Sequence, residues 1–265
     1  MDKKSKKIPI TKIGGLNNSN YLIELQDEKY VLRIPSSDNT NNFYSEHDIL
    51  SLIKHYSISP EILYHNKDNG ILLSKYMESS KFNLEFYNST TFINTLVNTL
   101  KKLHNLECTT YFNPFNEIYN NISFLNSVNF IFNHDINLLI TKLKDLEIKL
   151  CNKIHYGLCH NDLNTSNILS ANNFIYLIDF EFSGMGDIFF DLATISWFLK
   201  DEIQDYLIKK YFGYFDIELK EKLKDYLYVV KLWNATWSYK KSIDSKSDYD
   251  YRLGGNMILD DLINY

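Results

Sequence analysis

Three polar side chains in one short region have the types and spacing that phosphoryl transfer from a magnesium nucleotide requires. Asp162 and Asn167 belong to a His-x-Asp-x-x-x-x-Asn pattern that begins at His160, and Asp179 ends an apolar run farther along. The reaction needs a carboxylate facing the acceptor hydroxyl, an amide oxygen on the metal and a second carboxylate on the metal. The pattern therefore predicts Asp162 as the catalytic base and Asn167 and Asp179 as ligands of Mg²⁺, which prefers oxygen donors.

Two short apolar runs must position these side chains. Residues 168–169 and 174–178 are expected to form strands that aim Asn167 and Asp179 at one point. An Asp-x-x-x-x-Asn pair alone arises by chance in a chain this rich in asparagine. The preceding His160 and the strand that ends in an acid favour kinase chemistry over that coincidence.

The bulk composition is that of an ordinary globular protein. The chain has 265 residues, 45% hydrophobic and 23% charged, enough for one large domain or two lobes. A net charge of −5 argues against a nucleic-acid binder. No apolar stretch approaches the roughly 18 residues needed to span a membrane, and the basic N-terminus lacks a following apolar segment. Three cysteines without metal-site spacing fit a reducing compartment, so we expect a cytoplasmic protein.

A Gly/Asn-rich turn lies inside a β-rich N-terminal segment, residues 8–35, in which residues 26–29 connect two strands of a hairpin. Such a turn can bring backbone N–H groups over phosphates, because glycine lacks a Cβ and asparagine tolerates left-handed conformations. The alternative is a plain hairpin turn. The residues of this turn that we expect to contact ATP are Gly14, Gly15, Leu16, Asn17, Asn18 and Asn20.

Arg33 is a cation inside an otherwise apolar strand. A buried charge needs partners, and nucleotide phosphates together with an acid would supply them. Glu46, in the first turn of a helix expected over residues 43–56, is the candidate acid. Alternatively Arg33 faces solvent, and Glu46 is an ordinary acid near a helix N-terminus.

A connection between two lobes is expected after the N-terminal strands. Residues 62–64 and 71–73 have strand patterns, and residues 74–80 would form the hinge. Adenine would hydrogen-bond to the backbone there, at Tyr76 and Met77.

The chain beyond the hinge has helical periodicity. Phe92, Leu96, Leu100 and Leu103 fall on one helix face. Residues 108–116, with Pro114, are expected to form a loop. Two further amphipathic helices are expected over residues 121–150, and others over residues 201–213, 216–242 and 249–263.

The segment after the catalytic loop contains a Gly-x-Gly turn at residues 184–186. Asp187 is the expected N-cap of the helix that follows. Asp191 is expected to support the backbone of the catalytic loop. His104 is expected to be a capping or packing residue.

These pieces together resemble a known family. The segments that carry the resemblance are residues 11–16, 30–35, 160–163, 178–182 and 186–193. They resemble the choline/ethanolamine kinase family, particularly its bacterial branch, within the aminoglycoside phosphotransferase-like kinases. The resemblance implies an α+β, bilobal, protein-kinase-like fold. Residues 1–78 would form an N-terminal nucleotide-binding lobe with an antiparallel sheet and one helix, and residues 79–265 a mostly helical catalytic lobe.

The resemblance also assigns roles to single residues. It implies that Asp162 is the base, that Asn167 and Asp179 bind Mg²⁺, and that Arg33 contacts the phosphates of ATP. Asn164 stands where eukaryotic members often have glutamine near the acceptor. The Asp179-Phe180 pair is followed by Glu181 rather than glycine, and no Ala-Pro-Glu segment follows, so we expect a small-molecule acceptor.

The acceptor site is expected among C-terminal aromatic residues. Trp233 and Trp237 lie four residues apart and share a helix face. A quaternary ammonium is attracted to aromatic ring faces, and the resemblance implies that tryptophan and tyrosine from this region, including Tyr249, wall a choline site. Glu181 or a nearby acid would balance the ligand's positive charge. Such a tryptophan pair is otherwise usually a core feature.

We therefore expect ATP-dependent phosphorylation of choline to phosphocholine, with no membrane insertion. The alternatives are another acceptor (ethanolamine, thiamine or an aminoglycoside) and a non-catalytic kinase-like binding module. Acids that keep an aminoglycoside acceptor open are Asp244, Asp248, Asp250, Asp260 and Asp261.

Overall fold

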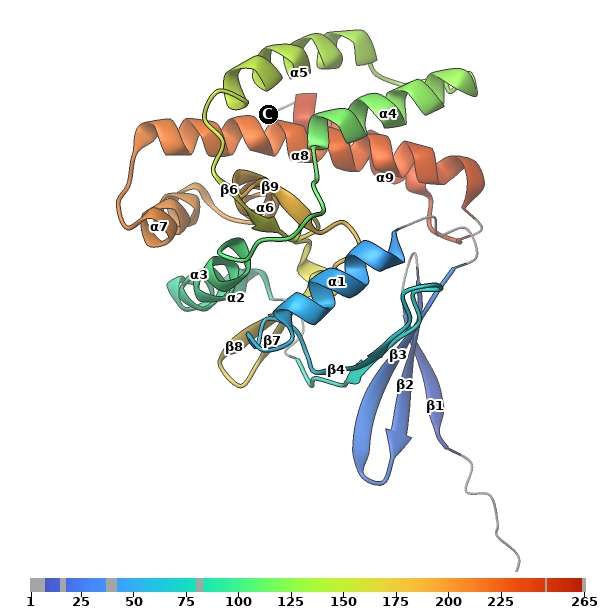
Figure 1. Ribbon diagram of the computed structural model, residues 1–265. Coiled ribbons are helices and arrows are strands. Elements are labelled where there is room, and N and C mark those ends of the chain that lie inside the picture. The colour runs from blue at the N-terminus through green and yellow to red at the C-terminus, as the bar shows by residue number, and fades with distance from the viewer. Residues whose placement is uncertain (1–7, 15–17, 37–41, 80–82, 246, 264–265) are drawn as a thin grey trace, which may run out of the picture. The chain divides into compact units, whose positions relative to one another are not determined.

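The computed structural model describes residues 8–14, 18–36, 42–79, 83–245 and 247–263 (Figure 1). The chain separates into two compact units. The first unit comprises Met1–Lys81 and Ile168–Glu181, and the second comprises Phe82–Asn167 and Phe182–Tyr265. An antiparallel N-terminal sheet and a mostly helical second unit confirm the predicted α+β class. The lobe boundary after residue 78 stays a prediction.

The first unit is built on a five-stranded antiparallel sheet of order β1-β2-β3-β5-β4. Its strands are β1 (Ile10–Gly14), β2 (Asn18–Leu25), β3 (Glu28–Pro35), β4 (Ile62–His65) and β5 (Leu72–Lys75). The predicted β2–β3 hairpin is confirmed. Gln26 and Asp27 turn the chain with φ of 50° and 67°, the left-handed pair that a two-residue hairpin turn needs.

β5 extends farther than the sequence predicted. Ser74 pairs with Val31 and Lys75 with Tyr30, and the Tyr76 N–H donates to the carbonyl oxygen of Lys29 at 2.9 Å. The prediction that Ser74 and Lys75 belong to a hinge is therefore wrong, because the ladder with β3 continues past them.

Helix α1 (Phe43–Ile53) begins at a capping residue, Asn42, whose side chain accepts a hydrogen bond from the Ser45 N–H at 3.2 Å. It ends at Ile53, short of the predicted residue 56. Ser57, with φ of 54°, then turns the chain through a left-handed conformation.

A two-stranded hairpin of β7 (Ile168–Ala171) and β8 (Phe174–Leu177) completes the first unit, which confirms the two predicted strands around the candidate metal ligands. The N–H of Leu177 donates to the carbonyl oxygen of Ile58 at 2.7 Å. Ile168 pairs with Leu177, so the chain enters and leaves the hairpin at the same end.

The second unit is a helical assembly around α8. Its helices are α2 (Leu84–Tyr87), α3 (Thr90–His104), α4 (Pro114–Ser127), α5 (Ile136–Leu150), α6 (Phe189–Ser196), α7 (Asp201–Phe212), α8 (Ile217–Asp244) and α9 (Tyr251–Ile263). Figure 1 shows α4 and α5 lying along α8, to which α9 also packs. The predicted apolar face of α3 is confirmed, because its four periodic residues are fully buried. Within the described ranges, no helix is long and apolar enough to cross a membrane.

Three local predictions in this unit are wrong. Pro114 lies at the start of α4 rather than in a loop, because Asn113 caps the helix by accepting from the N–H groups of Phe115 and Asn116. Proline is well tolerated there, since the first helical N–H has no partner inside the helix.

The predicted Gly-x-Gly turn is instead strand β9 (Gly184–Asp187), which pairs with β6 (Tyr156–Cys159). The N-cap of α6 is Ile188 rather than Asp187. Asp187 still accepts a hydrogen bond from the Phe189 N–H at 3.1 Å, and it pairs with the buried Lys222 ammonium at 2.6 Å.

Candidate active site

The side chain of Asp162 is held by two amides in the loop after β6. Asn164 Nδ2 donates to Asp162 Oδ1 at 3.0 Å, and Asn167 Nδ2 donates to Oδ2 at 2.8 Å and to the Asp162 carbonyl oxygen at 3.0 Å. Both carboxylate oxygens are thereby oriented. Because the nitrogen of Asn167 is committed to Asp162, its Oδ1 is the atom that can ligate a cation.

Asn164 is itself fixed by its neighbour. Its Oδ1 accepts hydrogen bonds from the Ser166 N–H, at 2.9 Å, and from the Ser166 hydroxyl. This orients the Asn164 amide nitrogen toward Asp162. Its role at the acceptor stays a prediction.

The backbone of the catalytic loop rests on Asp191, as predicted. The N–H of His160 donates to Asp191 Oδ2 at 2.8 Å and that of Asn161 to Oδ1 at 2.7 Å, and the Asp191 side chain is fully buried. Asn161 has φ of 65°, and its side-chain amide donates to the Phe182 carbonyl oxygen at 2.9 Å. The loop is therefore built on α6 and on a left-handed residue that asparagine tolerates.

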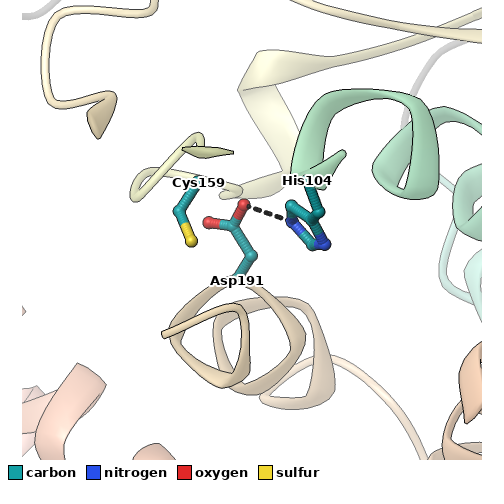
Figure 2. A group of neighbouring side chains, drawn as sticks. All are labelled: His104, Cys159 and Asp191. Atoms are coloured by element: carbon teal, nitrogen blue, oxygen red, sulfur yellow. Dashed lines mark hydrogen bonds and ion pairs between the residues drawn. The ribbon is translucent and has the colours of Figure 1, made fainter. Parts of the chain in front are cut away.

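His104, Cys159 and Asp191 form a buried cluster with ligand atoms within 4.8 Å of one another (Figure 2). These atoms already have other partners. His104 Nε2 is 3.1 Å from Asp191 Oδ2 and its Nδ1 is 2.7 Å from the Tyr211 hydroxyl. Burial raises the pKa of the Cys159 thiol well above its usual range, which keeps it protonated and a poor ligand. The cluster is a hydrogen-bonded support for the loop, in line with the packing role expected for His104.

The predicted Arg33–Glu46 ion pair is present in the first unit. Arg33 Nη2 lies 2.6 Å from Glu46 Oε2, and Arg33 Nη1 lies 2.9 Å from Asp179 Oδ1. The Arg33 and Glu46 side chains are 8% and 2% exposed, so the solvent-facing alternative for Arg33 is wrong.

The electrostatics of this group follow from burial and pairing. Burial alone would lower the pKa of Arg33, but Glu46 and Asp179 outweigh it and raise that pKa. Burial alone would raise the pKa of Glu46, but Arg33 and His65 lower it to about 2. Burial raises the pKa of Asp179, Arg33 opposes the rise, and the Glu46 carboxylate adds to it.

The strand register places several predicted phosphate contacts in one row. Gly14 pairs with Asn20, and Asn20 pairs with Arg33, so the side chains of Asn20 and Arg33 lie on one face of the sheet. Gly14, with φ of 126°, lies at an irregularity in the β1–β2 pairing. Asn18 is buried, 6% exposed. The other predicted members of the turn, Gly15, Leu16 and Asn17, lie outside the described residues.

The predicted adenine contacts stay predictions. The N–H of Tyr76 is already bound to Lys29. Met77 lines a pocket of about 460 Å³ at the C-terminal end of α1, which includes neither Arg33 nor Glu46. The other residues that line this pocket are Lys54, His55, Ser57, Ser59, Pro60, Glu61, Ile62, Lys75 and Tyr176.

Trp233 and Trp237 share a face of α8, as predicted. Both meet the ring of Phe182, at centroid distances of 5.3 and 6.4 Å. Trp233 is only 3% exposed and also packs on Phe112 and Phe190. Its surroundings are those of a core residue, whereas Trp237 is half-buried.

A second aromatic contact joins Trp237 to the start of α9. The ring of Tyr251 lies 5.9 Å from that of Trp237 and 4.9 Å from that of Tyr249, which is 47% exposed. The Lys241 ammonium lies 5.9 Å from the centroid of the Trp237 ring. These rings form an aromatic group that a cation can approach; the acceptor roles of Trp233, Trp237 and Tyr249 stay predictions.

The predicted site residues thus fall into two groups. Asp162, Asn164 and Asn167 lie together in the second unit. Arg33, Glu46 and Asp179 lie together in the first, where Glu181 also contributes to the raised pKa of Arg33. The meeting of Asn167 and Asp179 on one cation stays a prediction.

Sequence reasoning missed two residues of these groups. His65 lies 3.4 Å from Glu46, and Asn161 holds the catalytic loop through its conformation and its amide. The signal for His65 was a polar residue at the end of an apolar strand.

Comparison with known proteins agrees with this architecture. A sequence profile of the phosphotransferase enzyme family matches residues 10–226. Protein LicA of Haemophilus influenzae is 30% identical over 212 residues, which cover 77% of this chain. The chain spans 62% of the length of that relative, less than two thirds.

Solved structures share the fold. A choline/ethanolamine kinase family protein from Mesorhizobium loti has a TM-score of 0.84 at 19% identity, over 97% of this chain and 87% of that one. Choline kinase LicA from Streptococcus pneumoniae has a TM-score of 0.82 at 20% identity, over 97% and 94% of the two chains. The predicted kinase fold is confirmed. Because the family profile matches residues 10–226, which include Asp162 and the amides that orient it, the chain belongs to the phosphotransferase enzyme family.

Proposed function

We propose that the protein transfers the γ-phosphoryl group of ATP to the hydroxyl of choline and releases phosphocholine. The observation that carries this proposal is the Asp162 carboxylate, held between the amides of Asn164 and Asn167. A fixed carboxylate next to a potential metal ligand is what positioning an acceptor hydroxyl for phosphoryl transfer requires.

Asp162 would accept the proton of the acceptor hydroxyl. The two amide N–H groups favour its ionised form, which is the form that can act as a base. They also fix the plane of the carboxylate, so that the hydroxyl meets it in one orientation. The proton leaves the acceptor oxygen as that oxygen bonds to the γ-phosphorus, while the bond from that phosphorus to the β–γ bridging oxygen breaks and ADP leaves.

The donor set of the proposed metal site fits Mg²⁺. Asn167 offers Oδ1 and Asp179 offers a carboxylate, both hard oxygen ligands. When bound, Mg²⁺ would neutralise negative charge on the phosphates of the nucleotide. Neither residue is a soft sulfur or imidazole donor of the kind that favours zinc.

Arg33 is suited to contact the nucleotide phosphates. Its Nε is buried and has no hydrogen-bond partner among the described residues. An unpaired buried donor is costly, and a phosphate oxygen would satisfy it. Gly14 and Asn20 lie in the same row of the sheet as Arg33, which supports a phosphate site along this row.

Choline is favoured as acceptor by the aromatic group of Trp237, Tyr249 and Tyr251. A quaternary ammonium cannot donate a hydrogen bond but is attracted to ring faces. The similarity to LicA and to a choline kinase of that name supports the same acceptor. Glu181 would balance the positive charge of choline. A cytoplasmic location, where ATP is available, completes the proposal.

The test is an acceptor panel assayed for Mg-dependent ADP release. Choline, ethanolamine, thiamine and an aminoglycoside are compared at equal concentrations, with the phosphorylated product identified by ³¹P NMR. We expect choline to give the highest kcat/KM and phosphocholine as the product. Preference for another acceptor would overturn the choline assignment, and ATP consumption by none of them would favour a binding module.

A further inference from the structure

A continuous row of polar side chains crosses the first unit from His47 to Asp179. His47 Nδ1 lies 3.2 Å from His65 Nδ1, and His65 Nε2 lies 3.4 Å from Glu46 Oε2. Glu46 Oε2 accepts from Arg33 Nη2 at 2.6 Å, and Arg33 Nη1 donates to Asp179 at 2.9 Å. Helix α1 supplies His47 and Glu46, and strand β4 supplies His65.

The two histidine rings meet edge to edge. Their centroids are 5.4 Å apart and their planes differ by 20°. The two Nδ1 atoms are 3.2 Å apart. This distance plus one ring radius on each side is about equal to the distance between the centroids, so both Nδ1 atoms lie on the line that joins the centroids. This is the geometry of an N–H···N hydrogen bond rather than of face-to-face stacking.

Only one proton can lie between the two Nδ1 atoms, so one ring donates and the other accepts. Which ring donates follows from the surroundings of His65. The His65 side chain is 3% exposed, and its Nε2 faces the ionised Glu46, so Nε2 carries the proton. In that tautomer Nδ1 accepts the bond between the rings, and His47 donates from Nδ1. The Nε2–H of His65 then faces the Glu46 carboxylate at 3.4 Å.

Glu46 lies between Arg33 and His65. Its Oε2 accepts from Arg33 and lies 3.4 Å from His65 Nε2, within ion-pair distance, whereas neither Glu46 Oε1 nor His65 Nε2 has a hydrogen-bond partner in the part of the chain that is described. Arg33 alone would leave the carboxylate free to rotate about its terminal bond. The imidazole on the other side of Oε2 removes that freedom, and so fixes the direction of the Arg33 guanidinium.

We propose that His65, oriented by His47, is a positioning residue that holds Glu46 and thereby aims Arg33 at the phosphates of the nucleotide. The inference rests on the proposed role of Arg33 in nucleotide binding. On this proposal, ATP binding also depends on His65, a residue that does not itself touch ATP.

The test compares three substitutions in the first unit. His65→Leu removes the polar ring, His65→Gln keeps an amide donor, and Tyr64→Leu is the control at an exposed ring of the same strand. We expect His65→Leu to weaken ATP binding about tenfold, as loss of a polar contact with a charged group does, with little change in the KM of the acceptor. His65→Gln should recover most of the affinity, and Tyr64→Leu should match the parent. Equal weakening by the leucine and glutamine variants would overturn the proposal.

A second measurement is independent of activity and of any substitution. Long-range ¹H–¹⁵N NMR of the histidine rings at neutral or mildly alkaline pH reports which nitrogen carries the proton. We expect the Nε2–H tautomer for His65 and the Nδ1–H tautomer for His47. An Nδ1–H tautomer of His65 would overturn the proposal, even where His65→Leu fails to fold.

Arg33→Ala separates this inference from the proposed function. If Arg33→Ala leaves ATP affinity unchanged, the phosphate role of Arg33 is wrong, and the positioning role of His65 is wrong with it. If Arg33→Ala weakens ATP binding and His65→Leu does not, only the inference about His65 is overturned.

Discussion

Asn167 donates its side-chain amide to Asp162 at two points, the carboxylate Oδ2 at 2.8 Å and the backbone carbonyl oxygen at 3.0 Å. One side chain thus links the proposed base to the proposed metal site. A change in either residue disturbs the other, so their substitutions should not be additive.

Asp162→Ala should lower turnover about a thousandfold or more, because the acceptor hydroxyl loses its proton acceptor. ATP binding should stay measurable, since the contacts proposed for the phosphates are elsewhere. Steady-state kinetics and nucleotide titration check the two halves of this prediction. Asp145→Ala, at an exposed position of α5, is the control. Substantial turnover by the Asp162 variant would refute its assignment as base.

Removal of the divalent cation should abolish turnover, and Asp179→Asn should raise the Mg²⁺ concentration needed for half-maximal rate about tenfold or more. The amide lacks the charge of the carboxylate that we propose to bind the cation. A Mg²⁺ titration of the parent, of Asp179→Asn and of Asp145→Asn measures the effect. An unchanged Mg²⁺ requirement in the Asp179 variant would contradict its role as a ligand.

The Arg33–Glu46 pair predicts a pH dependence of stability. The pKa of Glu46 is about 2 in the folded protein, below the ordinary 4.5, so its stabilising effect is complete above about pH 4.5 and lost as the pH falls toward 2. Glu46→Gln should lower the free energy of unfolding at pH 7 by about 3 kcal/mol. Urea denaturation across this range should show the parent and variant converging at low pH; a constant difference would be the contrary result.

The cluster of His104, Cys159 and Asp191 should not hold a metal, because His104 and Asp191 are already bound to each other, to Tyr211 and to the loop backbone, and burial keeps the Cys159 thiol protonated by raising its pKa. Cys159→Ala should cost about 1 kcal/mol of stability, the effect of a small core deletion. We expect turnover close to that of the parent. Elemental analysis decides the question: one transition-metal ion per parent chain, lost in the variant, would show that this is a metal site.

Trp237→Leu should raise the KM of choline about tenfold, because the ligand would lose a cation–π partner. The KM of ATP should not change. Tyr214→Leu removes an exposed aromatic residue of the same unit, 57% exposed, and serves as the control. Kinetics at varied choline concentration check the prediction. A normal choline KM in the Trp237 variant would show that choline binds elsewhere.

Local chemistry was predictable from the sequence because it is encoded within a few residues. Asp162, Asn164 and Asn167 meet through contacts that span five positions or fewer. The Arg33–Glu46 pair was predictable for a different reason: a charge inside an apolar strand must have a partner, and an acid in the next helix could supply one.

The features that were not predicted depend on contacts between segments that are distant in the sequence, and no single segment encodes such contacts. Gly184–Asp187 contains two glycines, a poor composition for a strand, and it is extended because β6 pairs with it. β5 includes Ser74 and Lys75 because β3 continues beside them. His65 and His47 are 18 positions apart and meet only when β4 and α1 pack together.

The fully buried Asp191 carboxylate has a consequence for solvent exchange. It accepts the backbone N–H groups of His160 and Asn161, so those two protons can reach water only when the loop separates from α6. In deuterium-exchange measurements the amides beside the catalytic residue should therefore behave like those of a core helix, although they lie in a loop.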